Sequence, residues 1–346
     1  METHRRGRLC LSWTSIHILG YALSTGIFAL LALSISPAVV HGQQPRRIRI
    51  AITSPGMTNL NVYLAERQGF FQQQHIFNEI VVMRSAARQI QALVADSVEF
   101  SAQAPDPLIR AVERGADLTM LSGLANAAAY DLVSGSKYGS IEELRGTTLG
   151  VSGINSSSTL LLQKMLAAHG LAYPRDYTLV EVGGTSDRLT AIKTAAVSAG
   201  VLNPPISYVA AQQGLRILGE LRNYIPAVQF TALSVRRAWA HQNHTLVEDY
   251  LVALLRANRY LYENRPGTVA IIRDLFKVRP DHADRVYDYW IQHKVIPTDG
   301  AMTVPGTEVV LDILEQLGDF KGKMRPRAEK YIDNEWLRRA QKRITR

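Results

Sequence analysis

The chain has 346 residues, of which 47% are hydrophobic, a formal net charge of +9 and a single cysteine, Cys10. That length can form two lobes with apolar cores, and the lack of cysteine pairs excludes a small scaffold held together by disulfides. The basic residues are scattered, without the runs or aromatic platforms of nucleic-acid-binding proteins, so we expect no nucleic-acid partner.

The first 42 residues differ from the rest of the chain. Arg5, Arg6 and Arg8 precede an apolar run over residues 16–40, and a polar stretch begins at Gln43. A basic start, an apolar core and small residues near a cleavage point are typical of an export signal, which we predict over residues 1–42. The apolar run is also long enough to remain in the membrane as an anchor, and this alternative stays open.

After this segment, short strands alternate with amphipathic helices. Such an order is typical of an α/β protein with a mostly parallel sheet that helices cover on both faces. The apolar patterns predict strands over 47–52, 79–83, 99–104 and 118–124 and helices over 60–71, 87–98 and 107–116.

The same order recurs about a hundred residues later, which indicates an internal repeat. Gly69 lies 21 residues after Ile48, and Gly170 lies 22 residues after Thr148, so the two halves nearly match in spacing. Two similar α/β lobes imply a cleft between them. The second half is predicted to have strands over 147–153, 177–183 and 215–221, helices over 157–170, 186–200 and 206–214, and a proline turn at 201–205.

The stretch GVSGINSSST, residues 150–159, concentrates hydroxyl groups at the start of a predicted helix. Ligands of open α/β sheets bind beyond the carboxyl ends of the strands, and free amides in the first turn of a helix favour an anion. The functional interpretation is an anion-binding cradle of amides and hydroxyls. Ordinary helix capping by serine explains the same pattern, so both interpretations remain open.

Three segments of the chain carry a resemblance to a known family: residues 63–76, 90–124 and 140–153. They resemble the periplasmic solute-binding proteins of the nitrate, sulfonate and taurine class, which serve ABC importers. This resemblance implies a two-lobed type II binding-protein fold in which residues 43–139 and 230–346 form lobe 1 and residues 140–229 form lobe 2. It also implies crossing segments, near 130–139 and 230–237, that act as a hinge.

The resemblance further implies a receptor that captures a small organic anion, of the sulfonate or carboxylate type, between its lobes. Such a receptor is a periplasmic monomer that delivers its solute to an ABC permease in the inner membrane and has no catalytic residues, cofactor or metal. The expected ligand contacts are Ser54, Gly56, Met57, Ala104, Ser152, Asn155, Ser156, Ser157, Thr185 and Asn203. Arg84 and Arg88 follow a strand and could reach an anion, although both also fit a solvated surface.

Two alternatives to a transport receptor are considered. A pyrimidine-precursor synthase resembles the same proteins, but it relies on a cysteine-rich motif and an active-site histidine, whereas this chain offers Cys10 in the leader and His75 at a helix end. A sensory receptor would present its closed form to a membrane kinase instead of a permease. The sequence does not separate the sensory role from the transport role.

Overall fold

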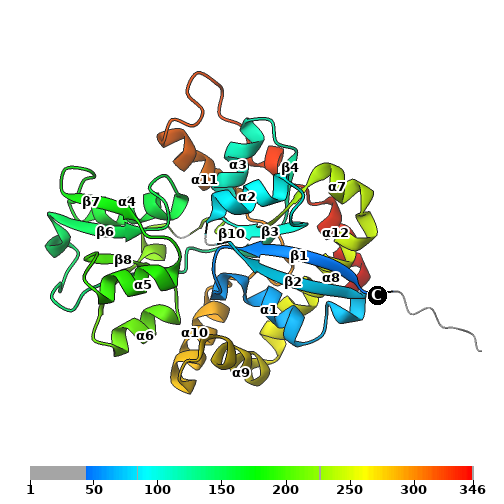
Figure 1. Ribbon diagram of the computed structural model, residues 1–346, viewed down its shortest axis with the longest axis horizontal. Coiled ribbons are helices and arrows are strands. Elements are labelled where there is room, and N and C mark those ends of the chain that lie inside the picture. The colour runs from blue at the N-terminus through cyan, green and yellow to red at the C-terminus, as the bar shows by residue number, and fades with distance from the viewer. Residues whose placement is uncertain (1–43, 84, 226, 345–346) are drawn as a thin grey trace, which may run out of the picture. The chain divides into compact units, whose positions relative to one another are not determined.

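The computed structural model describes residues 44–83, 85–225 and 227–344, and Figure 1 shows their helices and strands. The predicted export signal, residues 1–42, and Arg84 lie outside these ranges. Within the described ranges, none of the helices has both the length and the apolar character needed to cross a lipid bilayer.

The strands of the described residues form two five-stranded sheets with the same layout. The order is β2-β1-β3-β10-β4 in the first sheet and β7-β6-β8-β5-β9 in the second. In each sheet one strand, β10 or β5, runs antiparallel to both of its neighbours, and the others share one direction. The prediction of two α/β lobes with mostly parallel sheets is therefore confirmed.

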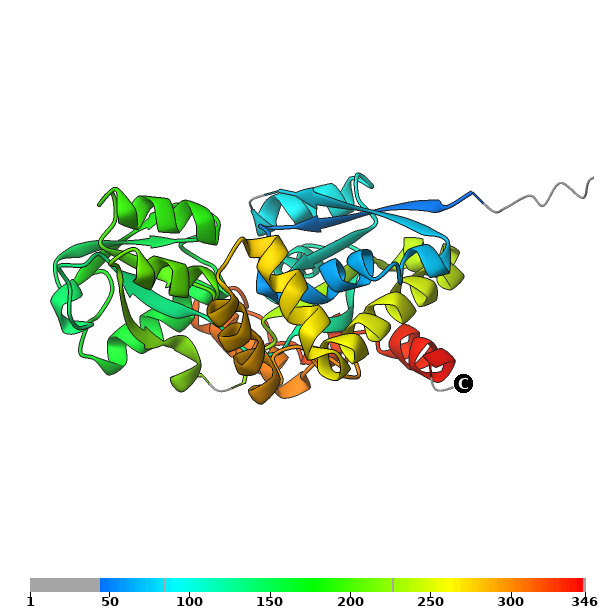
Figure 2. The same ribbon diagram turned by 90° about the horizontal axis from the view of Figure 1, so that it is seen from below.

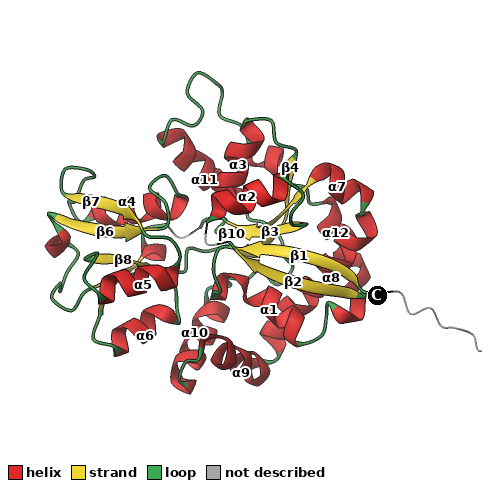
Figure 3. Ribbon diagram, in the orientation of Figure 1, coloured by secondary structure: helices red, strands yellow, loops and turns green. Residues whose placement is uncertain are grey.

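The first sheet and the helices packed around it form lobe 1. Figure 3 shows helices on both faces of this sheet. Its strands are β1 (Arg46–Ile52), β2 (Ile76–Val82), β3 (Phe100–Gln103), β4 (Leu118–Ala125) and β10 (Thr231–Arg236). Its helices are α1 (Leu60–Arg67), α2 (Ala86–Val94), α3 (Pro105–Glu113), α7 (Arg237–Gln242), α8 (His244–Glu263), α9 (Arg265–Phe276), α10 (Pro280–Gln292), α11 (Val304–Gln316) and α12 (Glu335–Ile344).

The second sheet and three helices form lobe 2. Its strands are β5 (Asp131–Ser134), β6 (Thr147–Val151), β7 (Tyr177–Glu181), β8 (Ala199–Leu202) and β9 (Arg216–Glu220). Its helices are α4 (Ser157–Ala168), α5 (Thr185–Lys193) and α6 (Ile206–Gln212).

Strand β1 shows how alternating side chains orient the first sheet. Ile48 and Ile50 are buried on the core side. Arg49, between them, faces the other way and forms an ion pair with Glu99 at 2.6 Å. Because successive side chains of a strand point to opposite faces, the pattern Arg-Ile-Arg-Ile fixes the orientation of the first half of β1, whereas Ala51 and Ile52 are buried on both faces.

Helix α8 anchors the C-terminal helices to the first sheet through an aromatic cluster. The ring of Tyr250 stacks on that of Phe100 with a centroid separation of 4.3 Å. The ring of Phe71 lies against that of Tyr250, with centroids 4.7 Å apart. The Tyr250 hydroxyl donates a hydrogen bond of 3.0 Å to Asn78, so the polar tip of this buried side chain is satisfied.

The chain crosses between the sheets earlier than the sequence indicated. Residues 130–139 were expected to form a hinge, but β5 lies within them and belongs to the second sheet. Likewise, the expected crossing at 230–237 is occupied by β10 of the first sheet. The connecting segments are 126–130 and 221–230, so lobe 2 begins near residue 131 instead of 140.

Hydrogen bonds join the two chain crossings, one at the end of the first segment and one at the last residue of β4, just before it. The amide of Leu221 donates to the carbonyl of Tyr130, and the amide of Phe230 donates to that of Ala125, both at 2.9 Å. Strand β5 was not predicted because all four of its residues are buried. It therefore lacks the alternation of apolar and polar residues that identifies a half-buried strand.

Strand β8 also differs from the expectation of a helix over residues 186–200 and a turn at 201–205. Helix α5 ends at Lys193, and Ala195 adopts a left-handed conformation with φ of 56°, which stops the helix. The small residues Ala199 and Gly200 then enter the centre of the second sheet. Alanine-rich sequence favours helix locally, so strand pairing decided the structure here.

Helix α10 brings lobe 1 side chains to lobe 2, and Figure 2 shows it lying beside the helices of that lobe. The guanidinium of Arg285 lies 4.3 Å from the ring centre of Tyr208 in α6. Arg222, which follows β9, forms a hydrogen bond of 2.7 Å with His293 at the end of α10.

Candidate ligand-binding cleft

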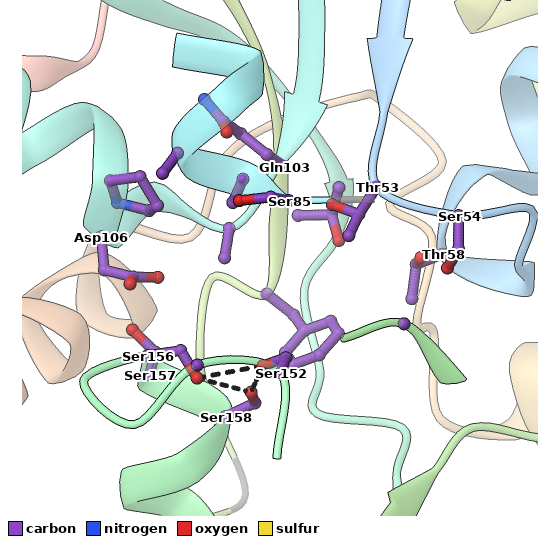
Figure 4. A pocket seen from close by; sticks show the side chains of 18 of the residues that line it. Thr53, Ser54, Thr58, Ser85, Gln103, Asp106, Ser152, Ser156, Ser157 and Ser158 are labelled. Carbon is purple, nitrogen blue, oxygen red and sulfur yellow. Dashed lines mark hydrogen bonds between the residues drawn. The ribbon is translucent and has the colours of Figure 1, made fainter. Parts of the chain in front are cut away.

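A cavity of about 670 Å³ lies between the two lobes. Its lining includes residues that directly follow β1, β3, β6 and β8, so it lies at the carboxyl ends of the parallel strands of both sheets. Figure 4 shows the wall formed by lobe 1, with Thr53, Gln103 and Asp106, opposite the serines of lobe 2. This is where an open α/β sheet ordinarily binds a ligand.

The structure brings the predicted contact residues together in this cavity, with one exception. Met57 has no exposed surface and packs in the apolar core, because the first turn after β1 directs its side chain inward. Whether the others touch a ligand remains a prediction. The residues that line the cavity are Ser54, Gly56, Ala104, Ser152, Asn155, Ser156, Ser157, Thr185 and Asn203.

The serine cluster at the start of α4 is held largely by its own hydrogen bonds, which Figure 4 shows as dashed lines. Ser156 is the N-cap of the helix and accepts a hydrogen bond of 3.4 Å from the amide of Thr159. Its hydroxyl also lies 3.1 Å from those of Ser152 and Ser158. Ser156 therefore has the ordinary capping role that the sequence left open.

Ser157 differs from its neighbours because its hydroxyl faces the other lobe. In Figure 4 the side chains of Ser157 and Asp106 point toward each other from opposite walls. Both residues are buried, and among the described residues neither Ser157 Oγ nor Asp106 Oδ1 has a hydrogen-bond partner. The two groups therefore face each other across the cleft without closing a hydrogen bond.

Asp106 is a buried carboxyl in the first turn of α3, with 2% of its surface exposed. The pKa of Asp106 is raised above its usual value, because the effect of burial outweighs the charge of the nearby Arg110. Arg110 approaches Asp106 at 3.3 Å and binds Asp319 more closely, through bonds of 2.9 and 3.0 Å. Arg110 is thus shared between two carboxylates.

Arg188, in the first turns of α5, is a buried cation in the wall formed by lobe 2, with 1% of its surface exposed. Its guanidinium donates to the carbonyl of Val201 at 2.8 Å, to that of Gly183, and to the hydroxyl of Thr185 at 3.4 Å. All of these acceptors are neutral, and within the described residues no carboxylate forms an ion pair with Arg188. Burial lowers its pKa, which the nearby Tyr130 hydroxyl opposes.

The wall formed by lobe 1 contains further polar atoms without partners. Both amide atoms of Gln103 and the Oδ1 atom of Asn59 are buried without a hydrogen bond to any described residue. A buried polar group that lacks a partner costs about 1–3 kcal/mol. These side chains line the cavity, so a polar ligand or bound water could supply what they lack.

Two glycines permit close contact between the lobes at the rim of the cavity. A Cβ atom on Gly184 of lobe 2 would lie 3.4 Å from Ser54 Cβ of lobe 1. A Cβ atom on Gly56 of lobe 1 would lie 3.2 Å from Asn203 Nδ2 of lobe 2. The rim is therefore packed tightly enough that an added methyl group would press on the other lobe.

Asp106, Arg188 and Gln103 were not among the ligand contacts predicted from the sequence. Gln103 and Asp106 lie at the end of β3, which is a usable signal, whereas Arg188 lies within α5. The burial of all three, and the atoms or charge that they leave unpaired, are visible only in the structure. Arg88, considered as an anion contact, is exposed and does not line the cavity. His75, the histidine considered for a synthase, is also exposed and outside the cavity lining.

The model of one protein family, described as NMT1/THI5 like, matches residues 57–266, which is more than half of the chain. The chain belongs to the NMT1/THI5-like family. The resemblance found in the sequence is thereby confirmed at the level of the family. No curated protein matches the chain in sequence.

Several solved structures resemble this NMT1/THI5-like protein. The nitrate-binding protein NrtA from Synechocystis PCC 6803 is 15% identical, with a TM-score of 0.72, and the match covers 86% of this chain and 89% of that one. The alkanesulfonate-binding protein SsuA from Xanthomonas axonopodis pv. citri, bound to MOPS, is 18% identical, with a TM-score of 0.67 and coverage of 84% and 99%.

A ligand-binding component of an ABC-type import system from Staphylococcus aureus, solved with zinc bound, is 14% identical, with a TM-score of 0.69 and coverage of 85% and 99%. Identities this low establish the fold and leave the ligand undetermined. The NMT1/THI5-like chain therefore has the two-lobed fold of periplasmic binding proteins, as the sequence predicted.

Proposed function

We propose that this protein is an extracytoplasmic receptor for a small organic anion. The observation that carries the proposal is Arg188, a buried cation that lines the cleft and binds only neutral acceptors among the described residues. A buried charge is costly unless it is paired. A sulfonate or carboxylate group beside the guanidinium would supply the missing negative charge through charge-assisted hydrogen bonds.

The mode of action follows from the two walls of the cleft. A solute that contacts both lobes binds the closed arrangement more tightly than the open one, so it shifts the population toward closure. Gln103 and Asn59 of lobe 1 and Ser157 of lobe 2 offer unpaired polar atoms for such contacts. The predicted contacts that line the cavity, from Ser54 to Asn203, contribute the remaining surface.

The partner and location belong to the same proposal. The structural relatives are described as nitrate-binding, alkanesulfonate-binding and ABC-import proteins, which supports delivery of the solute to an ABC permease from the periplasm. We also propose a monomer that binds its solute without chemical conversion. Among the described residues, the cavity lining includes neither histidine nor cysteine, the residue types on which the synthase alternative relies.

Binding of matched acids and neutral isosteres tests this proposal. Calorimetry and thermal shift would compare alkanesulfonates and carboxylates with the corresponding sulfonamides and carboxamides. We expect saturable binding of one class of acids and at least a tenfold preference over the neutral isostere, because only the acid pairs with Arg188. In Arg188→Gln we expect affinity for the acid to fall about 30-fold, as one charged hydrogen-bond donor is lost.

Arg114→Gln is the matched control, since Arg114 lines the same cavity but is exposed. Its affinity should stay within about threefold of wild type, because an exposed charge is screened by solvent. Arg188→Lys keeps the charge and replaces Arg188→Gln as the test variant if the glutamine variant has a much lower melting temperature than wild type. Equal binding of acids and neutral isosteres, or undiminished binding by both Arg188 variants, would contradict the proposal.

A further inference from the structure

We infer that the cleft selects for a single negative charge, so that it binds monoanions and rejects dianions of the same size. The residue that sets this limit is Asp106, which places a carboxyl group of lobe 1 in front of the N-terminus of α4 in lobe 2. This inference rests on the proposed function and specifies the charge of its solute.

Helix α4 begins within the serine cluster, with Ser156 as its N-cap. The N-terminus of a helix presents free amides and a positive dipole end, which together favour an anion. Here the side chain of Ser157 points at the buried carboxyl of Asp106 from across the cleft (Figure 4), although no hydrogen bond joins the two groups. The protein's own carboxyl group thus takes the position that the sequence suggested for the anion of a ligand.

Few positive charges in the described cavity lining remain for a ligand. Within the described residues, the cations in the cavity lining are Arg110, Arg114 and Arg188. Arg110 is bound by Asp106 and Asp319, and Arg114 is exposed to solvent. Only Arg188 is both buried and free of an ion pair among the described residues, so the cleft can fully compensate one negative charge.

A second negative charge on the ligand would face Asp106 of lobe 1, which repels it once the pH exceeds the raised pKa of this buried carboxyl. No uncompensated buried cation in the described lining is left to offset that repulsion. Like charges at close range in a poorly solvated site repel strongly, and desolvating the second charge adds to the cost. A monoanion that carries neutral polar groups avoids both penalties.

The ionisation of Asp106 makes this selectivity depend on pH. Asp106 faces the charge of Arg110 and the neutral hydroxyl of Ser157. The other charged groups on elements packed against α3 form ion pairs with other residues or are exposed to solvent. Glu308, Asp312 and Glu315 of α11 bind Arg325, Arg236 of β10 binds Asp96, and Arg88 of α2 is exposed. Asp106 is therefore expected to repel a dianion when ionised and to lose that effect when protonated at acidic pH.

Methanesulfonate and sulfate test the inference, because both are tetrahedral and of similar size but carry one and two charges. Neither anion changes its charge between pH 5 and pH 9. Any change in the ratio of their affinities over that range is therefore caused by the protein. Succinamate and succinate at pH 8 provide a second pair with a longer chain. Affinities would be measured by calorimetry on the purified protein, with competition against the tightest acid found in the screen.

In the wild type we expect each monoanion to bind at least about tenfold more tightly than its dianion at pH 8, with the sulfonate preference shrinking as the pH falls. Asp106→Asn keeps the size of the side chain and removes its charge. We expect this variant to bind the dianions more tightly, to reduce the preference below about threefold, and to show no pH dependence of that preference.

Glu181→Gln is the matched control, because Glu181 is a carboxylate that lines the same cavity but is exposed. It should keep the wild-type preference. Equal affinities for monoanion and dianion in the wild type, or an unchanged preference in a folded Asp106→Asn, would overturn the charge limit while leaving the receptor intact. Failure of every acid to bind the folded wild type would overturn the proposed function itself, and this inference with it.

Discussion

Asp131, at the start of β5, is a residue whose ionisation opposes folding. It is 4% exposed, and burial raises its pKa to about 6, although the Ser207 hydroxyl donates a hydrogen bond of 2.5 Å that acts to lower it. The carboxyl therefore binds its proton more tightly in the folded protein than in the unfolded chain. Such a group adds stability at low pH, and this contribution disappears as the pH rises through about 6.

We expect the free energy of unfolding to lose about 2 kcal/mol from this group between pH 4 and pH 7, because its pKa rises from 3.8 to about 6 on folding. Asp131→Asn removes the ionisation and can still accept from Ser207, so its stability should depend less on pH and exceed that of wild type at pH 7. Urea unfolding at several pH values measures both. Parallel pH curves for the two proteins would show that Asp131 does not govern this dependence.

At the scale of elements, β8 depends on a contact between two glycines in the second sheet. Gly150 of β6 and Gly200 of β8 are paired in register, and a Cβ atom on Gly200 would lie 2.9 Å from the Gly150 carbonyl oxygen. Because that neighbour is backbone, it cannot rotate away as a side chain can. The strand also carries the carbonyl of Val201, which accepts from Arg188.

Gly200→Ala is therefore expected to lower the free energy of unfolding by about 1–3 kcal/mol, the usual cost of overpacking. Gly135→Ala is its control, since the nearest atoms to a Cβ there are 3.9 Å away and its φ is not in the left-handed region. Urea unfolding of both variants gives the comparison. Equal stabilities would mean that the sheet accommodates the methyl group by shifting.

At the scale of the whole lobe pair, we expect the glycines of the rim, Gly56 and Gly184, to limit how closely the lobes approach. Gly184 and Gly56 have backbone angles that alanine also adopts, with φ of −68° and −171°, so adding a methyl group strains neither locally. A new Cβ atom on Gly56 would lie 3.2 Å from Asn203 of the opposite lobe, and one on Gly184 would lie 3.4 Å from Ser54 of the opposite lobe and from Asp187 of its own. The double variant Gly56→Ala, Gly184→Ala should therefore favour separated lobes.

Small-angle scattering with saturating ligand should give a larger radius of gyration for this variant, and its ligand affinity should be about tenfold lower, a shift of about 1.4 kcal/mol. Gly153→Ala is the control, since its Cβ would approach only Glu181 and Ser156, both in the same lobe. An affinity loss of the same size in the control would show that the effect comes from the cavity surface instead of closure.

The fold was largely predictable because its signals are local. The alternation in β1 and the repeated order of strands and helices each depend on neighbouring residues, and both appear in the structure. The three missed strands, β5, β8 and β10, are short and almost entirely buried, and they lack a periodic pattern. Strands β5 and β8 pair with each other, and β10 pairs with β3 and β4, over separations in sequence that no local pattern records.

The location of the cleft was also predictable from local signals, whereas the roles of its individual side chains were not. The sequence by itself determined that small polar residues follow the strands of both halves, and this located the cleft, because parallel strands end at a common edge of each sheet. Only the tertiary structure decided that Met57 turns into the core, that Asp106 faces Ser157, and that Arg188 is buried without a counter-ion among the described residues. Burial and charge compensation depend on segments far apart in the chain, so they exist only once the lobes have folded and come together.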